Sequence, residues 1–222
     1  MNKKRLIAIF LIIAMVIGTI SIILFKNEIS KEVETAEKPV IYVYNSTGKK
    51  DVAIGIEKPH GDYLDLTYPK AIKNYWKVTA DETGKLLIGN KKYNYLYWED
   101  SAPFPFNIDK GFCIRGEDTA QFLENALTEL GLNEYERNDF ITYWLPQMAN
   151  NKYNLISFNP PEYEEYYKLN SKPKADNTIR VFMMFIKTNE YENVQPQNLS
   201  AFNNCDRNGL TIVEWGGINF NK

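Results

Sequence analysis

Short strand-like segments separated by turn residues fill the chain between positions 39 and about 115. Val40–Tyr44 is apolar on both faces, as expected of an inner strand. Val52–Ile56 alternates apolar and other residues, which is typical of a half-buried strand, and Leu64–Tyr68 follows the same alternation. Further strands are predicted at 75–80, 86–88 and 93–99. Strands at this spacing predict a small antiparallel sheet or sandwich.

The pattern changes to a helical period near Asp118, which can cap a first helix. The apolar stripe of this helix contains Leu123, Ala126, Leu127 and Leu130. Gly131 is suited to the left-handed cap at its end. Asn133 and Glu136 have the spacing of a capping box and predict the start of a second helix. Pro146 is expected to kink or end that second helix. A helical hairpin packed on a sheet is therefore predicted.

Strands are predicted again at 153–158, 179–187 and 210–215. Val181–Ile186 is apolar on both faces, which predicts a place in the centre of a sheet. Because strands flank the helices on both sides, the sequence predicts one α+β domain. Its N-terminal part is an antiparallel β-rich sheet or sandwich, packed with the helical hairpin and further C-terminal strands. One N-terminal transmembrane helix is predicted to precede it.

That transmembrane helix is Leu6–Phe25, a run without charges behind the basic residues Lys3, Lys4 and Arg5. Its length suits the hydrocarbon core of a bilayer, about 30 Å thick. The basic flank favours a cytoplasmic N-terminus, with the rest of the chain outside. We therefore predict a signal-anchor at 1–25, a charged tether at 26–37 and an exported domain at 38–222. The alternative is a cleaved signal peptide and a secreted domain, although the run is long for one.

The composition is that of an ordinary globular protein, with 44% hydrophobic and 24% charged residues. The formal net charge is −2 at pH 7, and the predicted domain carries no basic cluster, which disfavours nucleic-acid binding. Abundant Lys, Asn and Ile suggest an AT-rich bacterial genome. The sequence contains no cofactor motif, and its single histidine and two cysteines are too few for a usual zinc site. The histidine, His60, is expected in a solvated turn.

The two cysteines, Cys113 and Cys205, could form a disulfide in an oxidising exterior. The alternative is that Cys113 is an ordinary small residue of an apolar strand. Spacing alone does not bring the two Cα atoms together.

Carboxylates are the candidate catalytic groups. Glu99, Glu117 and Glu214 form a possible acidic site, since a glycosidase needs two carboxyl groups on either side of the sugar bond. Glu214 lies in an apolar strand, where a buried carboxylate needs a partner. Glu117 instead has a simpler interpretation, because it favours the dipole at the start of the first helix.

Tyrosines form the candidate binding surface. Tyr93, Tyr95 and Tyr97 alternate with other residues and are predicted to share one face of a strand. On a solvent-exposed face their rings could stack on sugars or peptides. The alternative is that they pair across the sheet, since aromatic residues suit half-buried strands.

Several short segments occur in the same order as in one protein family. They are Lys38–Tyr44, Thr67–Pro69, Tyr95–Glu99, Gly116–Thr119, Tyr143–Pro146 and Val213–Gly217. Together they resemble a family of uncharacterised bacterial exported or membrane-anchored proteins over nearly the whole predicted domain. The family's opening strand usually reads Lys-Pro-Val-Ile-Tyr-Leu-Tyr-Pro, whereas Val43 and Asn45 stand here at the Leu and final Pro positions. The resemblance supports the domain limits and implies no catalytic residue.

These patterns predict a non-enzymatic binding or interaction module at the cell envelope. The expected partners are the membrane, through Leu6–Phe25, and an envelope polymer or a protein. One alternative is a carboxylate-dependent hydrolase acting on an envelope glycan. Another is an accessory subunit of a membrane complex.

Overall fold

The computed structural model describes residues 34–102, 108–202 and 206–221, which build two β-sheets and a few helices. The larger sheet has seven strands, in the order β3-β7-β1-β12-β11-β9-β8. All neighbours in it are antiparallel except β11 and β12, which are parallel. The strands, in sheet order, are β3 (Leu66–Tyr68), β7 (Leu96–Ala102), β1 (Glu34–Asn45), β12 (Leu210–Asn219), β11 (Asn177–Thr188), β9 (Tyr153–Phe158) and β8 (Phe112–Arg115).

The smaller sheet has five antiparallel strands in the order β10-β2-β4-β5-β6. They are β10 (Lys168–Lys172), β2 (Lys50–Glu57), β4 (Tyr75–Ala80), β5 (Leu86–Ile88) and β6 (Lys91–Tyr93). The helices are α2 (Thr119–Glu129), α3 (Glu134–Met148) and α4 (Pro161–Tyr166). Three 3₁₀ turns are η1 (Pro59–Gly61), η2 (Gly116–Asp118) and η3 (Leu199–Phe202).

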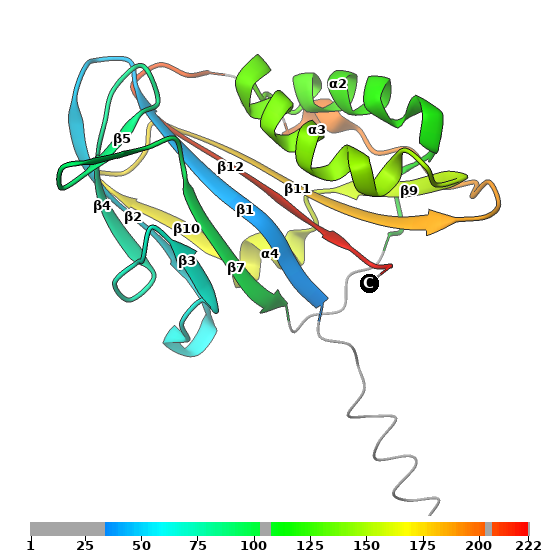
Figure 1. The fold of residues 1–222 in the computed structure, drawn as a ribbon, viewed down its shortest axis with the longest axis horizontal. Coiled ribbons are helices and arrows are strands. Elements are labelled where there is room, and N and C mark those ends of the chain that lie inside the picture. The colour runs from blue at the N-terminus through cyan, green and yellow to red at the C-terminus, as the bar shows by residue number, and fades with distance from the viewer. Residues whose placement is uncertain (1–33, 103–107, 203–205, 222) are drawn as a thin grey trace, which may run out of the picture. The chain divides into compact units, whose positions relative to one another are not determined.

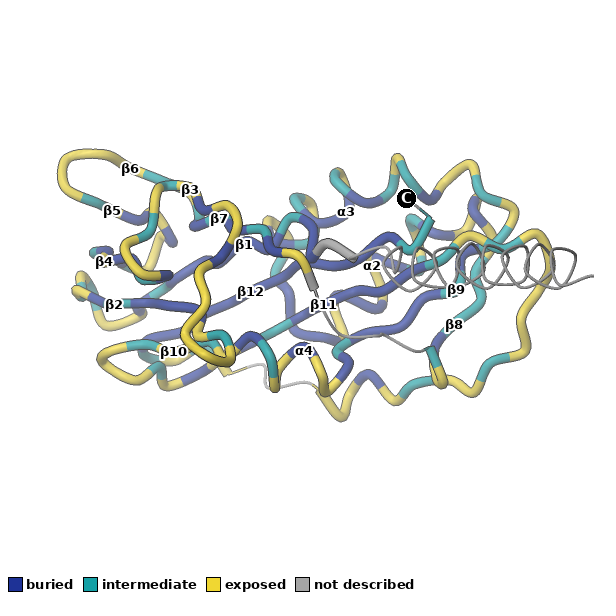
Figure 2. The backbone as a smooth tube through the Cα atoms, turned by 90° about the horizontal axis from the view of Figure 1, so that it is seen from below, coloured by how far each residue is buried: buried dark blue, intermediate teal, exposed yellow. Residues whose placement is uncertain are grey.

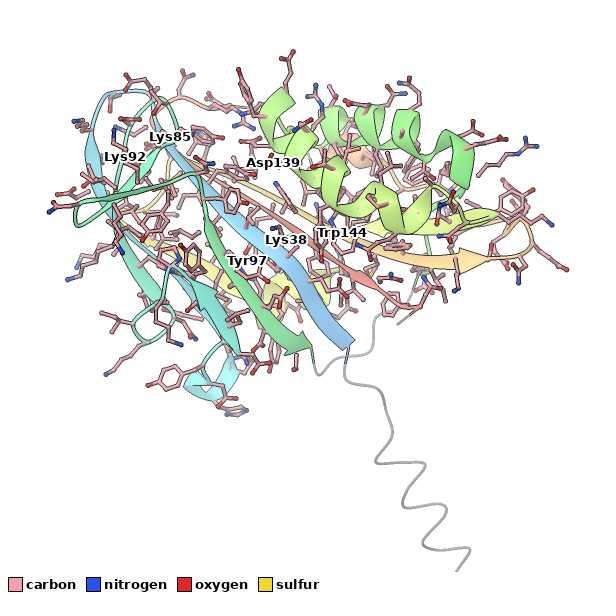
Figure 3. All side chains as sticks on the ribbon, in the orientation of Figure 1. Lys38, Lys85, Lys92, Tyr97, Asp139 and Trp144 are labelled. Atoms are coloured by element: carbon pink, nitrogen blue, oxygen red, sulfur yellow. The ribbon has the colours of Figure 1, made fainter. Side chains whose placement is uncertain are left out.

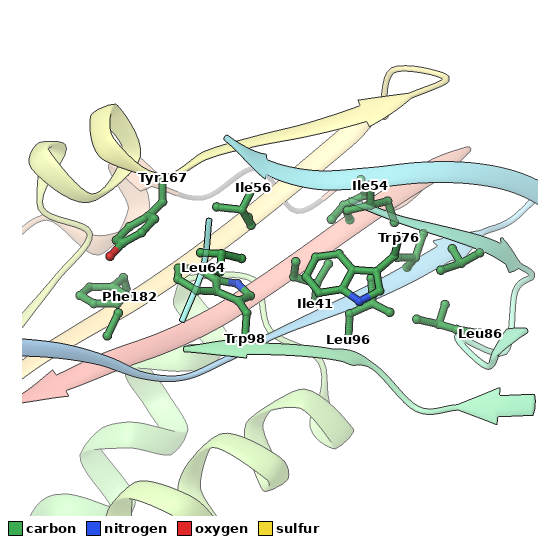
Figure 4. Packing of buried hydrophobic residues seen from close by; sticks show 14 of the residues in the cluster. Ile41, Ile54, Ile56, Leu64, Trp76, Leu86, Leu96, Trp98, Tyr167 and Phe182 are labelled. Carbon is green, nitrogen blue, oxygen red and sulfur yellow. The ribbon is translucent and has the colours of Figure 1, made fainter. Parts of the chain in front are cut away.

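The seven-stranded sheet is the middle layer of the fold. Helices α2 and α3 cover one of its faces (Figure 1). On this face Phe140 and Trp144 pack on Trp215 and Phe185. Its other face packs against the five-stranded sheet and α4. Figure 4 shows Ile41, Trp98 and Phe182 of the large sheet in this second core, with Ile54 and Trp76 of the small one. Strands β1, β12 and β11 are therefore buried along most of their length (Figure 2).

Both predicted helices form, and the details of their ends differ. The capping box of α3 is confirmed: Asn133 Oδ1 accepts from the Glu136 backbone N–H, and Glu136 Oε2 accepts from the Asn133 N–H. Gly131 has the expected left-handed φ of 93°. Asp118 occupies the predicted N-cap position of α2, but its side chain makes no capping bond within the described residues and it lies in η2. Pro146 does not end α3, which continues to Met148.

The mixed α+β prediction is confirmed, and strands make up most of the fold. The expected separation into N-terminal and C-terminal β parts is not seen, because β1 and β12 are neighbours in one sheet. Strand β1 begins at Glu34, so residues 34–37, expected in the tether, belong to the sheet. The expected half-buried strand at 64–68 is a three-residue edge strand whose Leu66 and Tyr68 are exposed. Neither α4 nor β10 was predicted.

Within the three described ranges, no helix is long and apolar enough to cross a membrane. The predicted transmembrane segment Leu6–Phe25 lies outside the described residues, as does Cys205.

Candidate functional site

Tyrosines gather where strands β3, β7 and β1 leave the cover of the helices. Tyr68 pairs with Tyr97 across β3 and β7, and Tyr97 pairs with Val40 across β7 and β1. Directly opposed residues of antiparallel strands share a face, so these side chains lie on the side of the sheet where α3 packs. Tyr68 is 63% exposed, and Tyr97 is half-buried. The corner of the sheet thus presents aromatic rings to solvent.

Lys38 lies among these rings. The register of β1 shifts between Glu37 and Val40, and Lys38 takes a left-handed φ of 55°. Its Nζ lies 5.4 Å from the ring centroid of Tyr97, 5.6 Å from that of Tyr143 and 5.8 Å from that of Tyr95. All three distances lie within the range of cation–π attraction, about 6 Å. Figure 3 shows Lys38 and Tyr97 on adjacent strands below α3.

We call this set of residues the tyrosine surface: Lys38, Tyr68, Tyr95, Tyr97 and Tyr143. It is assembled from β1, β3, α3, β7 and the residue that immediately precedes β7. The bulge at Lys38 explains how a strand residue reaches three rings, since a bulge redirects a side chain out of the regular alternation.

Two carboxylates border the tyrosine surface. The Tyr143 hydroxyl donates to Glu37 Oε2 at 3.2 Å. Burial raises the pKa of Tyr143 above its ordinary value, and the negative charge of Glu37 adds to the effect. Burial and a hydrogen bond to Glu99 likewise raise the pKa of Tyr97. Both hydroxyls therefore keep their protons above the pH of about 10 at which an unperturbed tyrosine titrates.

The aromatic series continues under the start of α3, where it becomes part of the core. The ring of Tyr42 lies 5.4 Å from that of Tyr95 in an edge-to-face contact, and 6.4 Å from that of Tyr44. The Tyr42 hydroxyl donates to Asp139 Oδ2 at 2.8 Å. Tyr42 is only 5% exposed, so a ligand can reach Tyr68, Tyr97 and their neighbours but not this inner end.

The predicted row of Tyr93, Tyr95 and Tyr97 is not one continuous strand face. Tyr93 ends β6 and pairs with Leu86 in the five-stranded sheet, whereas Tyr97 belongs to β7 in the seven-stranded sheet. Tyr93 nevertheless reaches the tyrosine surface, because its ring lies 5.9 Å from that of Tyr68. The sequence did not indicate Lys38, Tyr68 or Tyr143, which come from segments far from the row.

The three predicted acidic residues are not brought together. Glu214 faces the core between the sheets, is 1% exposed and accepts from Trp98 Nε1 at 3.1 Å and from Arg180 Nε at 2.6 Å. Its expected need for a partner is thus met by Arg180. Glu99 neighbours Trp98 in β7 and therefore points to the opposite face of the sheet. Glu117 lies in η2 and forms an exposed ion pair with Arg115 at 3.4 Å.

A second buried ion pair lies near the first and was not predicted. Asp100 is 1% exposed, and its Oδ2 lies 2.7 Å from Lys58 Nζ and accepts from the Tyr167 hydroxyl at 2.8 Å. The alternation in β7 contained the signal, because Asp100 shares a face with the buried residues Leu96 and Trp98. Both ion pairs are enclosed by side chains and link the sheets to the α4 region.

The remaining candidate residues do not form a chemical centre in the described part of the chain. His60 is exposed in η1, as expected of a solvated turn. Cys113 is half-buried in β8, and its Sγ accepts from the Glu192 N–H at 3.2 Å. Because Cys205 lies outside the described residues, the disulfide remains a prediction. Across residues 34–102, 108–202 and 206–221, no cluster of three His, Cys, Asp or Glu is arranged to hold a metal ion.

By its fold this is a mixed α+β protein built mainly of strands, and its candidate site is an open aromatic surface. The chain is 29% identical over 103 residues to a protein of Butyrivibrio fibrisolvens described as an uncharacterized protein in the bglA 3′ region. The similarity covers 45% of this chain and 98% of that protein. No protein-family model matches the chain, and no solved structure matches it.

Proposed function

We propose that this chain is a non-enzymatic binding module anchored to the outer side of the cell membrane, and that its tyrosine surface binds an envelope polymer. The observation that carries the proposal is the gathering of Tyr95, Tyr97 and Tyr143 around Lys38, with the exposed Tyr68 paired to Tyr97 on the neighbouring strand. The anchoring part rests on the apolar run Leu6–Phe25 behind a basic terminus.

The chemistry of the surface suits a glycan. Tyrosine rings offer flat apolar area together with a hydroxyl, so they can pack on the C–H faces of sugar rings while still making hydrogen bonds. Glu99, which is half-buried, supplies an acceptor for sugar hydroxyls, and the Lys38 ammonium supplies a donor. Because the rings come from two strands, a helix and the residue before β7, the surface suits an extended polymer better than a compact small molecule.

The test is co-sedimentation of the full chain, held in lipid nanodiscs, with purified insoluble envelope polymer. The variant Tyr68→Ala, Tyr97→Ala is expected to bind at least about tenfold more weakly, since aromatic contacts contribute about 0.5–1.5 kcal/mol each beyond their buried area. The matched control is Tyr135→Ala, Tyr191→Ala, which removes tyrosines that are 82% and 64% exposed elsewhere on the molecule. Equal binding by both variants, or none by the parent chain, would contradict the proposal.

One observation favours a second candidate function, a carboxylate-dependent hydrolase acting on the same polymer. The Tyr143 hydroxyl donates to Glu37, and Glu99 shares a face of β7 with Tyr97, so two carboxylates border the tyrosine surface. Glu214, sealed by Arg180, does not take part in this arrangement. If the chain is a hydrolase, it releases soluble sugar from the polymer and Glu99→Gln stops the release while binding is kept. Absence of any released product would exclude this second function.

A further inference from the structure

An exposed apolar tip lies at one end of the domain and adjoins the tyrosine surface through β3, which carries both Leu66 and Tyr68. Tyr63, Leu66 and Ile72 are 64%, 47% and 79% exposed. Lys70 and Lys73 lie among them and are also exposed. Tyr63, Lys70 and Lys73 line a shallow hollow of about 300 Å³. Large apolar side chains gathered in this way on a surface indicate an interaction site.

The apolar tip is held in a fixed conformation. Lys73 and Asn74 have φ values of 51° and 62°, and Ile72 and Tyr75 exchange backbone hydrogen bonds of 2.9 and 3.0 Å, as in a tight two-residue hairpin turn. The Asn74 side chain accepts from the Leu64 N–H and donates to the Asp62 carbonyl, both at 2.9 Å. The turn that carries Ile72 is thus fastened to the segment that carries Tyr63.

The apolar tip also lies beside the beginning of β1. Asp65 Oδ2 accepts from the Ser101 backbone N–H at 2.9 Å and from its hydroxyl at 2.8 Å. Ser101 pairs in turn with Thr35, the second residue of β1. Figure 1 shows the cyan turn between β2 and β3 and the first residues of β1 at the same lower side of the domain.

The length of chain before β1 limits how far this end can lie from the apolar run. Eight residues, 26–33, separate Phe25 from Glu34. At about 3.3–3.6 Å per residue they span at most about 30 Å when fully extended. If Leu6–Phe25 is the proposed anchor, the beginning of β1 and the neighbouring apolar tip are confined to the region next to the bilayer surface.

We infer that the apolar tip docks on the outer surface of the lipid bilayer. Tyr63, Leu66 and Ile72 enter the interfacial region, where tyrosine and aliphatic side chains are stable. Lys70 and Lys73 meet the phosphates of anionic lipids, which attract lysines close to the surface. This inference rests on the proposed membrane anchoring. It adds that the domain is held at the bilayer by a second contact and does not swing freely on its tether.

The test uses full-length chain in vesicles of phosphatidylcholine and phosphatidylglycerol that contain brominated lipid, a quencher of tryptophan fluorescence. The native tryptophans Trp76, Trp98, Trp144 and Trp215 are at most 3% exposed, which gives a background that the lipid does not reach. The variant Ile72→Trp places a fifth tryptophan on the apolar tip. The matched control Tyr135→Trp places it at the start of α3, where Tyr135 is 82% exposed. Carbonate extraction of the same vesicles reports separately whether the chain is anchored.

The expected result is retention after extraction, with quenching of Ile72→Trp by about the share of one tryptophan in five and no quenching of Tyr135→Trp. Adding Lys70→Glu and Lys73→Glu to Ile72→Trp should reduce the quenching, and the corresponding arginine substitutions should preserve it. Retention without quenching at position 72, or with equal quenching at 135, overturns the docked tip and leaves the anchor standing. Release by carbonate overturns the anchor, and the inference with it.

Discussion

Arg180 and Glu214 are directly paired residues of the parallel strands β11 and β12, and 2.6 Å separates Arg180 Nη2 from Glu214 Oε2. The guanidinium also donates to the Tyr167 carbonyl at 2.8 Å and lies 4.7 Å from the ring centroid of Tyr163. The two charged side chains are 9% and 1% exposed. The pair therefore holds α4 and its tyrosines against the two central strands.

Removal of one charge of this pair should be far more costly than removal of both. Glu214→Gln leaves a buried, unpaired guanidinium and should lower the free energy of unfolding by about 3–5 kcal/mol. The double variant Arg180→Met, Glu214→Leu buries no charge and should lose less than Glu214→Gln. Chemical denaturation of the purified variants measures both values. A double variant as unstable as the single one would show that the pair itself, and not the orphaned charge, supplies the stability.

The helix caps allow a matched comparison. Asn133→Ala removes the observed capping box of α3 and should cost about 1 kcal/mol of stability. Asp118→Ala should cost much less, because the Asp118 side chain makes no capping bond among the described residues. Glu136→Ala should cost more than Asn133→Ala, since Glu136 also binds Arg207 through contacts of 2.7 and 3.0 Å. Thermal unfolding of the three variants gives the order, and the reverse order for Asn133 and Asp118 would contradict the assignment.

Two adjacent glycines of β12 should differ in their tolerance of a methyl group. A Cβ on Gly217 would lie 2.5 Å from the Met183 carbonyl oxygen and 2.8 Å from an indole carbon of Trp144. Gly217→Ala should therefore destabilise the protein by about 1–3 kcal/mol through overpacking. A Cβ on Gly216 would lie 3.0 Å from Pro39, so Gly216→Ala should lose less. The denaturant midpoints of the two variants measure this difference. Equal midpoints would refute the close approach at Gly217.

Alkaline pH should unfold the protein through its buried tyrosines. Burial is the largest cause that raises the pKa of Tyr42, Tyr163 and Tyr167, whereas a hydrogen bond to Glu57 raises the pKa of Tyr75 to about 12. Below pH 10 both folded and unfolded states keep these protons, since an unperturbed tyrosine titrates near about 10. Above that pH the unfolded state releases protons that the folded state retains, so stability falls as pH rises.

The corresponding measurement is tyrosinate absorbance followed together with circular dichroism. The native protein should show an early group of exposed tyrosines and a late group that ionises only as the structure is lost. In strong denaturant all fifteen tyrosines should titrate in one step. A single step near pH 10 with the structure intact would mean that the buried hydroxyls are not protected.

The sequence predicted helices and strands well where the signal lies in residues that are adjacent in the chain. The capping box at Asn133 and the doubly apolar strand around Val181–Ile186 were both found, because each depends on residues adjacent in sequence. The edge strand at Leu66 and Tyr68 was misjudged, since alternation shows that two faces exist but not which face is covered. Asp118 stands at the predicted start of α2, but residue type alone does not reveal that its side chain makes no capping bond among the described residues.

The candidate site could be predicted only in part for a related reason. Tyr95 and Tyr97 were indicated by their own alternation. Lys38 and Tyr143 join them through sheet pairing and helix packing, which bring together residues about a hundred positions apart in the chain. Nothing local marks the bulge that turns Lys38 toward the rings, although its left-handed backbone is uncommon for a residue with a side chain.

The position of β1 between β7 and β12 has a consequence for how the chain acquires its structure. Ile41, near the start of the domain, pairs with Glu214, near its end, so the central ladder closes a loop that contains almost all the other elements. Such non-local pairing slows folding, because the entropy of the whole loop must be lost before the contacts form. During synthesis from the N-terminus, the β1–β12 ladder therefore cannot form until β12 has been made. Until β12 arrives, the edges of β1 and β11 remain open to proteases and to other chains.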